Sequence, residues 1–137
     1  MIVDTNVVSE MMRGDPTDTV SAWLRTCDAG TLGIAAVTVQ EITFGLTRMT
    51  PGVRQQRLAE AWDRLMHRDM ALFVHPLSSL MAQAAALLQV RREQSGRHLG
   101  VADAQIAATA LVLGHPLATR NTRDFDGLGV TLINPWD

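Results

Sequence analysis

Short apolar segments alternate with stretches of helical periodicity along the whole chain. The apolar segments have the length of buried strands and lie at residues 2–3, 31–37, 71–75, 116–119 and 130–133. Helical patterns separate them, at 7–12, 15–30, 38–49, 51–68, 78–90 and 100–113. This alternation predicts βα units and therefore an α/β fold, in which helices cover both faces of a short, mostly parallel sheet in three α/β/α layers.

The length and composition favour one ordinary globular domain spanning residues 1–137. Apolar residues make up 47% of the chain and charged residues 19%, so disorder is not expected. No apolar run approaches the roughly 18 residues of a membrane span, and no signal-peptide pattern opens the chain, so we expect no membrane contact and a cytoplasmic location. Cys27 is the only cysteine, which excludes an internal disulfide and a cysteine-based zinc site; a packed thiol is expected.

Several local patterns predict where helices begin and where the chain is exposed. Asp15-Pro16 has the form of an N-cap with proline at the first helical position, and Ser78 is expected to cap another helix. Gly114 is well placed to end the alanine-rich helix over Gly100 to Leu113. We interpret 91–97 as an exposed connection and 120–126 as a polar loop.

Three carboxylates lie in apolar surroundings at places where a helix is expected to begin. Asp4 directly follows the first strand, Glu41 ends the capping-box pattern that starts at Thr38, and Asp103 lies in the first turn of its helix. Each also has a purely structural interpretation, as a helix N-cap, a capping-box partner or a complement to the helix macrodipole. For Asp4 alone, the capping and functional interpretations are equally acceptable.

The coincidence of the three carboxylates favours a shared site. The carboxyl ends of parallel strands lie at one edge of a sheet, so residues that follow different strands meet there. Carboxylates brought together repel one another unless they are protonated or bridged by a cation. Mg²⁺ and Mn²⁺ prefer oxygen ligands and keep water molecules that a phosphate can replace. The pattern therefore predicts a divalent-metal site for a phosphate-bearing substrate.

A polar segment after the fourth predicted strand supplies further candidates for the same edge. It runs Thr119-Arg120-Asn121-Thr122-Arg123-Asp124. Asn121 and Asp124 are expected to reach the sheet edge, and Thr119 to orient a water molecule or a carboxylate. Segments of this composition are more often simple turns, so the segment has weight only together with the three carboxylates.

Taken in order, these motifs resemble the PIN domain, and more narrowly the VapC and FitB toxins of type II toxin–antitoxin modules. The resemblance covers essentially the whole chain and ends in a FitB-like tail at 134–136. It rests on Val3-Asp4-Thr5-Asn6, Gln40-Glu41-Ile42-Thr43-Phe44-Gly45, Ala102-Asp103-Ala104-Gln105-Ile106-Ala107-Ala108-Thr109-Ala110 and Thr119-Arg120-Asn121-Thr122-Arg123-Asp124-Phe125. It implies a PIN-like α/β/α fold and a Mg²⁺-dependent endoribonuclease, with Mn²⁺ as a possible substitute.

The resemblance also implies roles for individual residues. Asp4, Glu41 and Asp103 match the acidic residues of the family, and Asp124 matches an acidic place used by members that carry Asn at position 121. Asp4, Asp103 and Asp124 are then the metal ligands, and Asp124 acts directly, through water or only as support. Glu41 positions or deprotonates the attacking water. The remaining polar residues are expected to support the site or contact substrate: Thr5, Asn6, Thr119 and Asn121.

Partners follow from the same resemblance. It implies a homodimer, an RNA substrate and a cognate antitoxin whose C-terminal segment places an arginine among the carboxylates. Operator DNA would be bound only through the antitoxin, because nothing in this chain has the form of a DNA-binding motif. The net charge of −2 also argues against binding nucleic acid by charge alone.

Three interpretations remain open alongside these. One alternative is a catalytically silent PIN-fold module that acts only by binding antitoxin or RNA. Another is a phosphohydrolase with Asp4 as nucleophile, although such enzymes usually need Asp-x-Asp and position 6 is Asn. The basic face of the predicted helix over 51–68 is either an RNA contact or an ordinary solvated surface.

Overall fold

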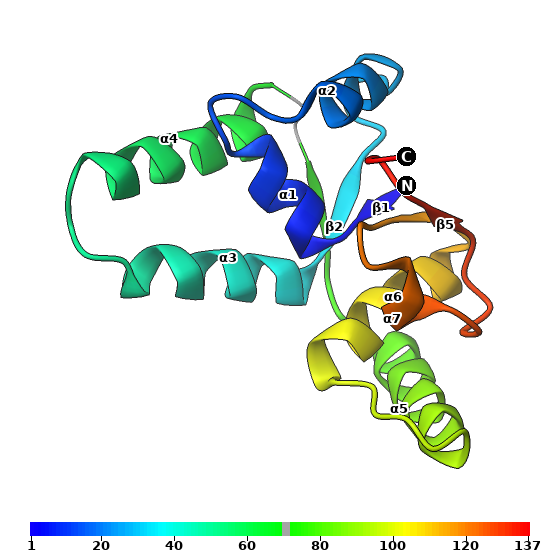
Figure 1. Ribbon diagram of the computed structural model, residues 1–137. Coiled ribbons are helices and arrows are strands. Elements are labelled where there is room, and N and C mark those ends of the chain that lie inside the picture. Colours follow the sequence, from blue (N-terminus) through cyan, green and yellow to red (C-terminus); the bar gives the residue numbers. More distant parts are fainter. Residues whose placement is uncertain (70–71) are drawn as a thin grey trace.

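A parallel sheet of five short strands lies at the centre of the computed structural model, which describes residues 1–69 and 72–137 (Figure 1). The strands are β1 (Ile2–Val3), β2 (Gly33–Ala35), β3 (Phe73–His75), β4 (Leu117–Ala118) and β5 (Leu132–Ile133). Their order in the sheet is β3-β2-β1-β4-β5, and every neighbouring pair is parallel. The predicted parallel sheet is confirmed; position 71 of the predicted third strand lies outside the described residues.

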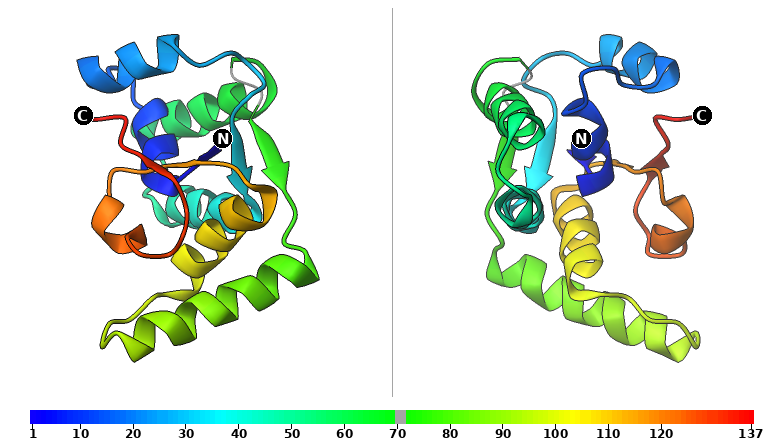
Figure 2. Two further views of the ribbon diagram at one scale, coloured as in Figure 1. Left: turned by 90° about the vertical axis from the view of Figure 1, so that its right-hand side faces the viewer. Right: turned by 60° about the vertical axis from the view of Figure 1, so that its left-hand side comes forward.

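Seven helices of the described chain pack around this sheet. They are α1 (Thr5–Met11), α2 (Asp18–Arg25), α3 (Ala36–Arg48), α4 (Val53–His67), α5 (Ser79–Gln94), α6 (Val101–Leu113) and α7 (Thr122–Phe125). In Figure 1, α3 and α4 lie on the opposite side of the molecule from α5, α6 and α7. In both views of Figure 2, α5 forms the lower margin of the molecule. The predicted α/β/α arrangement is therefore confirmed.

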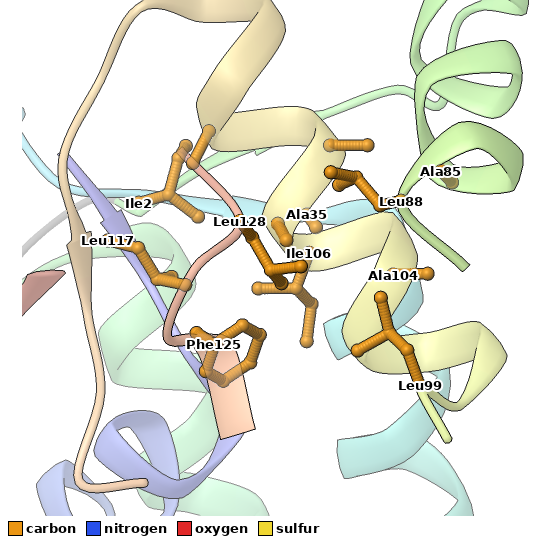
Figure 3. Close-up of a cluster of buried hydrophobic side chains, with 13 residues drawn as sticks. Ile2, Ala35, Ala85, Leu88, Leu99, Ala104, Ile106, Leu117, Phe125 and Leu128 are labelled. Atoms are coloured by element: carbon orange, nitrogen blue, oxygen red, sulfur yellow. The ribbon is translucent and has the colours of Figure 1, made fainter. Parts of the chain in front are cut away.

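The alternation of side chains along each strand produces two separate cores. Ile2 and Leu117 point into a cluster with Leu88, Ile106 and Phe125 of the helices α5, α6 and α7 (Figure 3). The next residue of each of these strands points the other way, into a second cluster with α1, α3 and α4: Val3 and Ala118 meet Val7, Val8, Ile42, Ala61 and Leu65. Cys27 packs half-buried against this second cluster, as expected for a structural thiol.

Two helix ends follow their local signals and one does not. The Ser78 hydroxyl accepts a hydrogen bond from the Met81 N–H at 3.1 Å and caps α5, and Gly114 ends α6 with φ of +68°. The predicted N-cap at Asp15 is wrong, because α2 begins two residues later with Thr17 as its cap residue. The reason is a tertiary contact: the Thr17 N–H donates to the buried Glu10 carboxylate at 2.8 Å.

Two polar segments that we predicted to be irregular are helical. Helix α5 continues through Gln94, so the predicted exposed connection over 91–97 is wrong in its first half. Arg92 lies on the same face of α5 as the buried Ala85 and Leu88, and its Nη2 donates to the Asp126 carbonyl at 3.0 Å. The predicted loop over 120–126 contains the four-residue helix α7, whose Phe125 is buried in the first core. No helix of the described residues has the length and apolar character needed to cross a membrane.

Candidate active site

The strand order marks the carboxyl ends of β1 and β4 as the place where a ligand site is expected. Both β2 and β3 lie on one side of β1, whereas β4 and β5 lie on the other, so the direction of winding reverses between β1 and β4. Ligands of open α/β sheets bind at such a reversal, beyond the carboxyl ends of the strands. Asp4 directly follows β1, and Thr119 directly follows β4. The sequence prediction that these residues meet is confirmed by the hydrogen bond between them.

Asp4 is held by hydrogen bonds at both of its carboxylate oxygens. Its Oδ1 accepts the Thr5 N–H at 2.7 Å, which makes it the N-cap of α1, and its Oδ2 accepts the Thr119 hydroxyl at 2.7 Å. The residue is 5% exposed. Burial raises the pKa of Asp4, the two hydrogen bonds oppose that rise, and the charges of Glu41 and Asp124 add to it. The Asp4 side chain therefore both caps α1 and belongs to the candidate site.

Glu41 reaches this edge from the second turn of α3. The Thr5 hydroxyl donates to its Oε1 at 2.7 Å and lies 3.2 Å from the hydroxyl of the buried Thr38. The predicted capping box is wrong, because α3 begins at Ala36 and Thr38 lies inside the helix. The chain passes from β2 into α3 without a loop, so Ala35 is both the last strand residue and the N-cap.

Asp103 lies half-buried in the first turn of α6, as predicted. Burial is the main cause that raises the pKa of Asp103 to about 6, and repulsion from Asp4, Asp124 and Glu41 adds to it. The positive charge of Arg92 opposes this rise only in part. Asp103 therefore lies within electrostatic range of each of the other three carboxylates.

The segment after β4 connects the other predicted site residues. The Thr119 hydroxyl, which donates to Asp4, accepts the Asn121 N–H at 3.0 Å. The Arg120 N–H donates to Asn6 Oδ1 at 3.4 Å, a long hydrogen bond that joins this segment to α1. Asp124 follows on α7 and is exposed. The segment therefore begins beside Asp4, and its residues 122–125 form a helix where a loop was predicted.

The four carboxylates have the donor chemistry of a hard divalent cation. Each comes from a different part of the fold, and within residues 1–69 and 72–137 none of them forms an ion pair. Burial raises the pKa of both Asp4 and Asp103, and the neighbouring carboxylates add to the rise, so a bound cation would be favoured at this edge. In the same described residues, no three Asp, Glu, His or Cys side chains lie close enough to share one ion. The donor set is thus chemically suited to Mg²⁺ or Mn²⁺ but does not form a closed ligand shell.

Arg92 is the residue near this site that sequence reasoning missed. It is 4% exposed, and its charge acts on Asp103. A signal was present, because Ala85, Leu88 and Arg92 recur at helical spacing on one face. The polar run that follows, from Glu93 to Arg97, masked that signal.

Comparisons with known proteins give a consistent result over the full length. Residues 1–130 match the family model described as PIN domain. A VapC ribonuclease, Y4jK, from Sinorhizobium fredii is 35% identical over 137 residues, which is 100% of this chain and 98% of the relative. Toxin FitB from Neisseria gonorrhoeae is 30% identical over 136 residues, 99% of this chain and 98% of the relative. A solved structure of FitAB bound to an IR36 DNA fragment superposes with a TM-score of 0.88 at 30% identity, over 99% of this chain and 95% of that one.

Proposed function

Because the chain belongs to the PIN-domain family, we propose that it is a metal-dependent endoribonuclease toxin of a toxin–antitoxin pair. The observation that carries the proposal is the group of four carboxylates near the winding reversal, where burial, with added repulsion from Asp4, Asp124 and Glu41, raises the pKa of Asp103 to about 6. The names of the relatives support it, since one is a VapC ribonuclease and another is toxin FitB. Hydrolysis of RNA phosphodiester bonds is the reaction that fits both the group of carboxylates and the names of the relatives.

The proposed metal ligands are Asp4, Asp103 and Asp124, which lie within electrostatic range of one another. A bound Mg²⁺ or Mn²⁺ supplies positive charge that polarises the scissile phosphate and lowers the pKa of an attacking water. Thr119 keeps the Asp4 carboxylate oriented through its 2.7 Å hydrogen bond. The same hydrogen bond lowers the pKa of Asp4 and so opposes the larger effect of burial, which raises it.

Glu41 is the proposed base for the attacking water. The Thr5 hydroxyl donates to Glu41 Oε1 at 2.7 Å, which leaves the second carboxylate oxygen to accept a proton from water. Asn6 and Asn121 are proposed to contact substrate or to support the site. Asn6 Oδ1 accepts the Arg120 N–H, and the Asn121 N–H donates to the Thr119 hydroxyl. Both residues are thereby joined to the segment after β4.

A cognate antitoxin is the proposed protein partner and inhibitor. The comparison structure FitAB is a complex bound to a DNA fragment, which supports a partner that also carries the DNA contact. An antitoxin arginine at this edge would satisfy the same uncompensated carboxylates that a metal would satisfy. Inhibition and DNA binding are then both properties of the complex.

A second copy of the chain is the other proposed partner. Helix α5 packs on α6 through one face, whereas Leu80, Leu87 and Val90 are 61%, 71% and 51% exposed. An interface between two identical chains joins the same patch of both, so one apolar stripe is enough to form it. In a single copy of the chain this apolar stripe is exposed to water, and RNA would not bury it. The α5 helix of a second copy would.

The ribonuclease proposal is tested with protein purified free of any antitoxin. We expect cleavage of single-stranded RNA with Mg²⁺ or Mn²⁺, loss of cleavage with EDTA, and at least 100-fold slower cleavage by Asp4→Asn. The exposed Asp63 on α4 provides the matched control, because Asp63→Asn removes the same charge away from the site. Equal rates for the wild type and Asp4→Asn would refute the mechanism. No cleavage with either ion, together with retained RNA binding, would favour a catalytically silent module.

A further inference from the structure

A hollow of about 400 Å³ adjoins the proposed site and is lined only by polar side chains. It lies between the end of α5 and the segment around α7. Its lining residues are Arg97, Arg120, Asn121, Thr122, Arg123 and Asp124. We call this feature the arginine hollow. Three of its six lining residues are cations, in a chain whose net charge is −2.

Two of the three arginines of the hollow have side-chain contacts before any ligand binds. The Arg120 guanidinium lies over the Trp136 ring, 5.2 Å from its centroid. Arg97 Nη2 donates to the Arg123 carbonyl at 3.0 Å, which uses one of the five donors of that guanidinium. Side chains that are already ordered lose less conformational entropy when they bind a ligand.

The charges of the arginine hollow are available, and the chain places them beside the carboxylates. Among the described residues, Arg97, Arg120 and Arg123 form no ion pair. Arg120 directly follows Thr119, the residue bonded to Asp4, and Arg123 directly precedes Asp124. A positive surface therefore begins where the negative edge of the proposed active site ends.

We propose that the arginine hollow binds a backbone phosphate of the RNA strand next to the phosphate that is cleaved. This inference rests on the proposed ribonuclease function and adds where the strand lies. A divalent ion at the four carboxylates would offset at most two of their charges, so the remaining carboxylate charge would repel the phosphate next to the scissile one unless cations face it. Arginine is the side chain whose planar donors match two phosphate oxygens at once.

An acidic peptide is the competing ligand, and the lining of the hollow argues against it. Protein partners bury apolar and aromatic side chains at the centre of an interface. None of the six lining side chains is apolar, so a peptide would gain little from burial there. A phosphodiester needs only the charges and donors that the hollow supplies.

The test measures binding of a fluorescent ten-nucleotide single-stranded RNA to the full chain in EDTA, where cleavage does not proceed. We expect Arg120→Gln and Arg123→Gln each to weaken binding about tenfold and to lower the slope of log Kd against log salt by about 0.7. Arg120→Lys is expected to restore part of the affinity, because it keeps the charge but loses the paired donors. Arg25→Gln at the exposed end of α2 is the matched control, and all variants are checked for an unchanged Tm.

Three results would overturn the inference. The first is an unchanged slope of log Kd against log salt for Arg120→Gln and Arg123→Gln, in a protein that does cleave RNA. The proposed function would then stand, and only the inference about the hollow would fail. The second is an equal loss with Arg57→Gln on the basic face of α4, which would place the strand there or show a general charge effect. The third is competition by oligo-glutamate at the same concentration as RNA, which would show a carboxylate ligand. Failure of the wild type to cleave any RNA with Mg²⁺ or Mn²⁺ would instead refute the proposed function.

Discussion

Asp103 shows how a site residue can act against the stability of its own fold. In the folded chain burial and three neighbouring carboxylates raise its pKa from 3.8 to about 6. The folded state therefore binds the proton more tightly than the unfolded state does. As the pH rises from about 4 to about 6, the free energy of unfolding falls because the folded chain must give up that proton against repulsion. Above pH 6 this decrease in the free energy of unfolding is complete.

Replacing this carboxylate should therefore stabilise the metal-free protein while it abolishes cleavage. In EDTA at pH 7 we expect Asp103→Asn to raise Tm by about 3 °C, the shift that roughly 1 kcal/mol causes in a domain of this size, after allowance for solvent screening. At pH 4 the difference should disappear, because the wild-type carboxyl is then protonated in the folded state. Thermal unfolding by circular dichroism at both pH values measures this, with Asp63→Asn as the control. A lower Tm for Asp103→Asn at pH 7 would mean that the carboxylate stabilises the fold.

Site residues were predictable where one elementary rule was sufficient. Asp4 follows an apolar pair, and the rule that parallel strands end at one edge placed it beside the segment after β4. Glu41 was identified as a candidate, and the capping box that offered a purely structural interpretation of it does not exist. Its actual partner is Thr5, 36 residues away, and no local pattern indicates that contact. The arginine hollow was missed for the same reason, because it joins Arg97 to Arg120 and Arg123 only in the folded chain.

At the level of elements, local signals were reliable where the local chain alone decides. Ser78 and Gly114 act within one helical turn, and both mark helix ends as predicted. Tertiary contacts decided the other ends. Glu10 fixes the start of α2 through the Thr17 N–H, and burial of Arg92 extends α5 through a segment that is polar enough to be a loop.

The pairing of β2 with β3 depends on the absence of a side chain at Gly33. A Cβ atom there would lie 2.6 Å from His75 Nε2 and 3.1 Å from the Phe73 carbonyl oxygen. The His75 ring packs edge-on against Phe73, with 4.7 Å between the ring centroids, so moving His75 away would disturb this contact. We expect Gly33→Ala to lower the free energy of unfolding by about 1–3 kcal/mol, measured by urea denaturation.

A double-mutant cycle separates this clash from other effects of the substitution. His75→Ala removes the nearest obstacle, so Gly33→Ala should cost much less in the His75→Ala background than in the wild type. Equal costs in the two backgrounds would show that His75 is not the obstacle and that the Phe73 carbonyl accounts for the loss.

For the whole molecule, the order of the strands explains why opposite charges lie side by side. The reversal of winding between β1 and β4 collects the carboxylates at one edge of the sheet. The segment that leaves β4 carries Thr119 to that edge and turns directly into Arg120 and the short helix α7. The segment after β4 thus brings Arg120 and Arg123 beside carboxylates from other parts of the fold, although the net charge is only −2. A local field of this kind depends on the fold and is not visible in composition.

The exposed stripe of α5 leads to a prediction about the assembly. We expect the antitoxin-free protein to be a dimer, and Leu87→Glu to raise its dissociation constant about 100-fold or more. Leu87 is 71% exposed, and a twofold interface contains it twice, so each dimer loses two buried leucines and gains two facing charges. Sedimentation equilibrium measures the change. Val53 is 63% exposed on α4, and Val53→Glu therefore provides a matched control that should leave the dimer intact. A monomeric wild type, or a Leu87→Glu variant that dimerises as tightly, would show that α5 is not the interface.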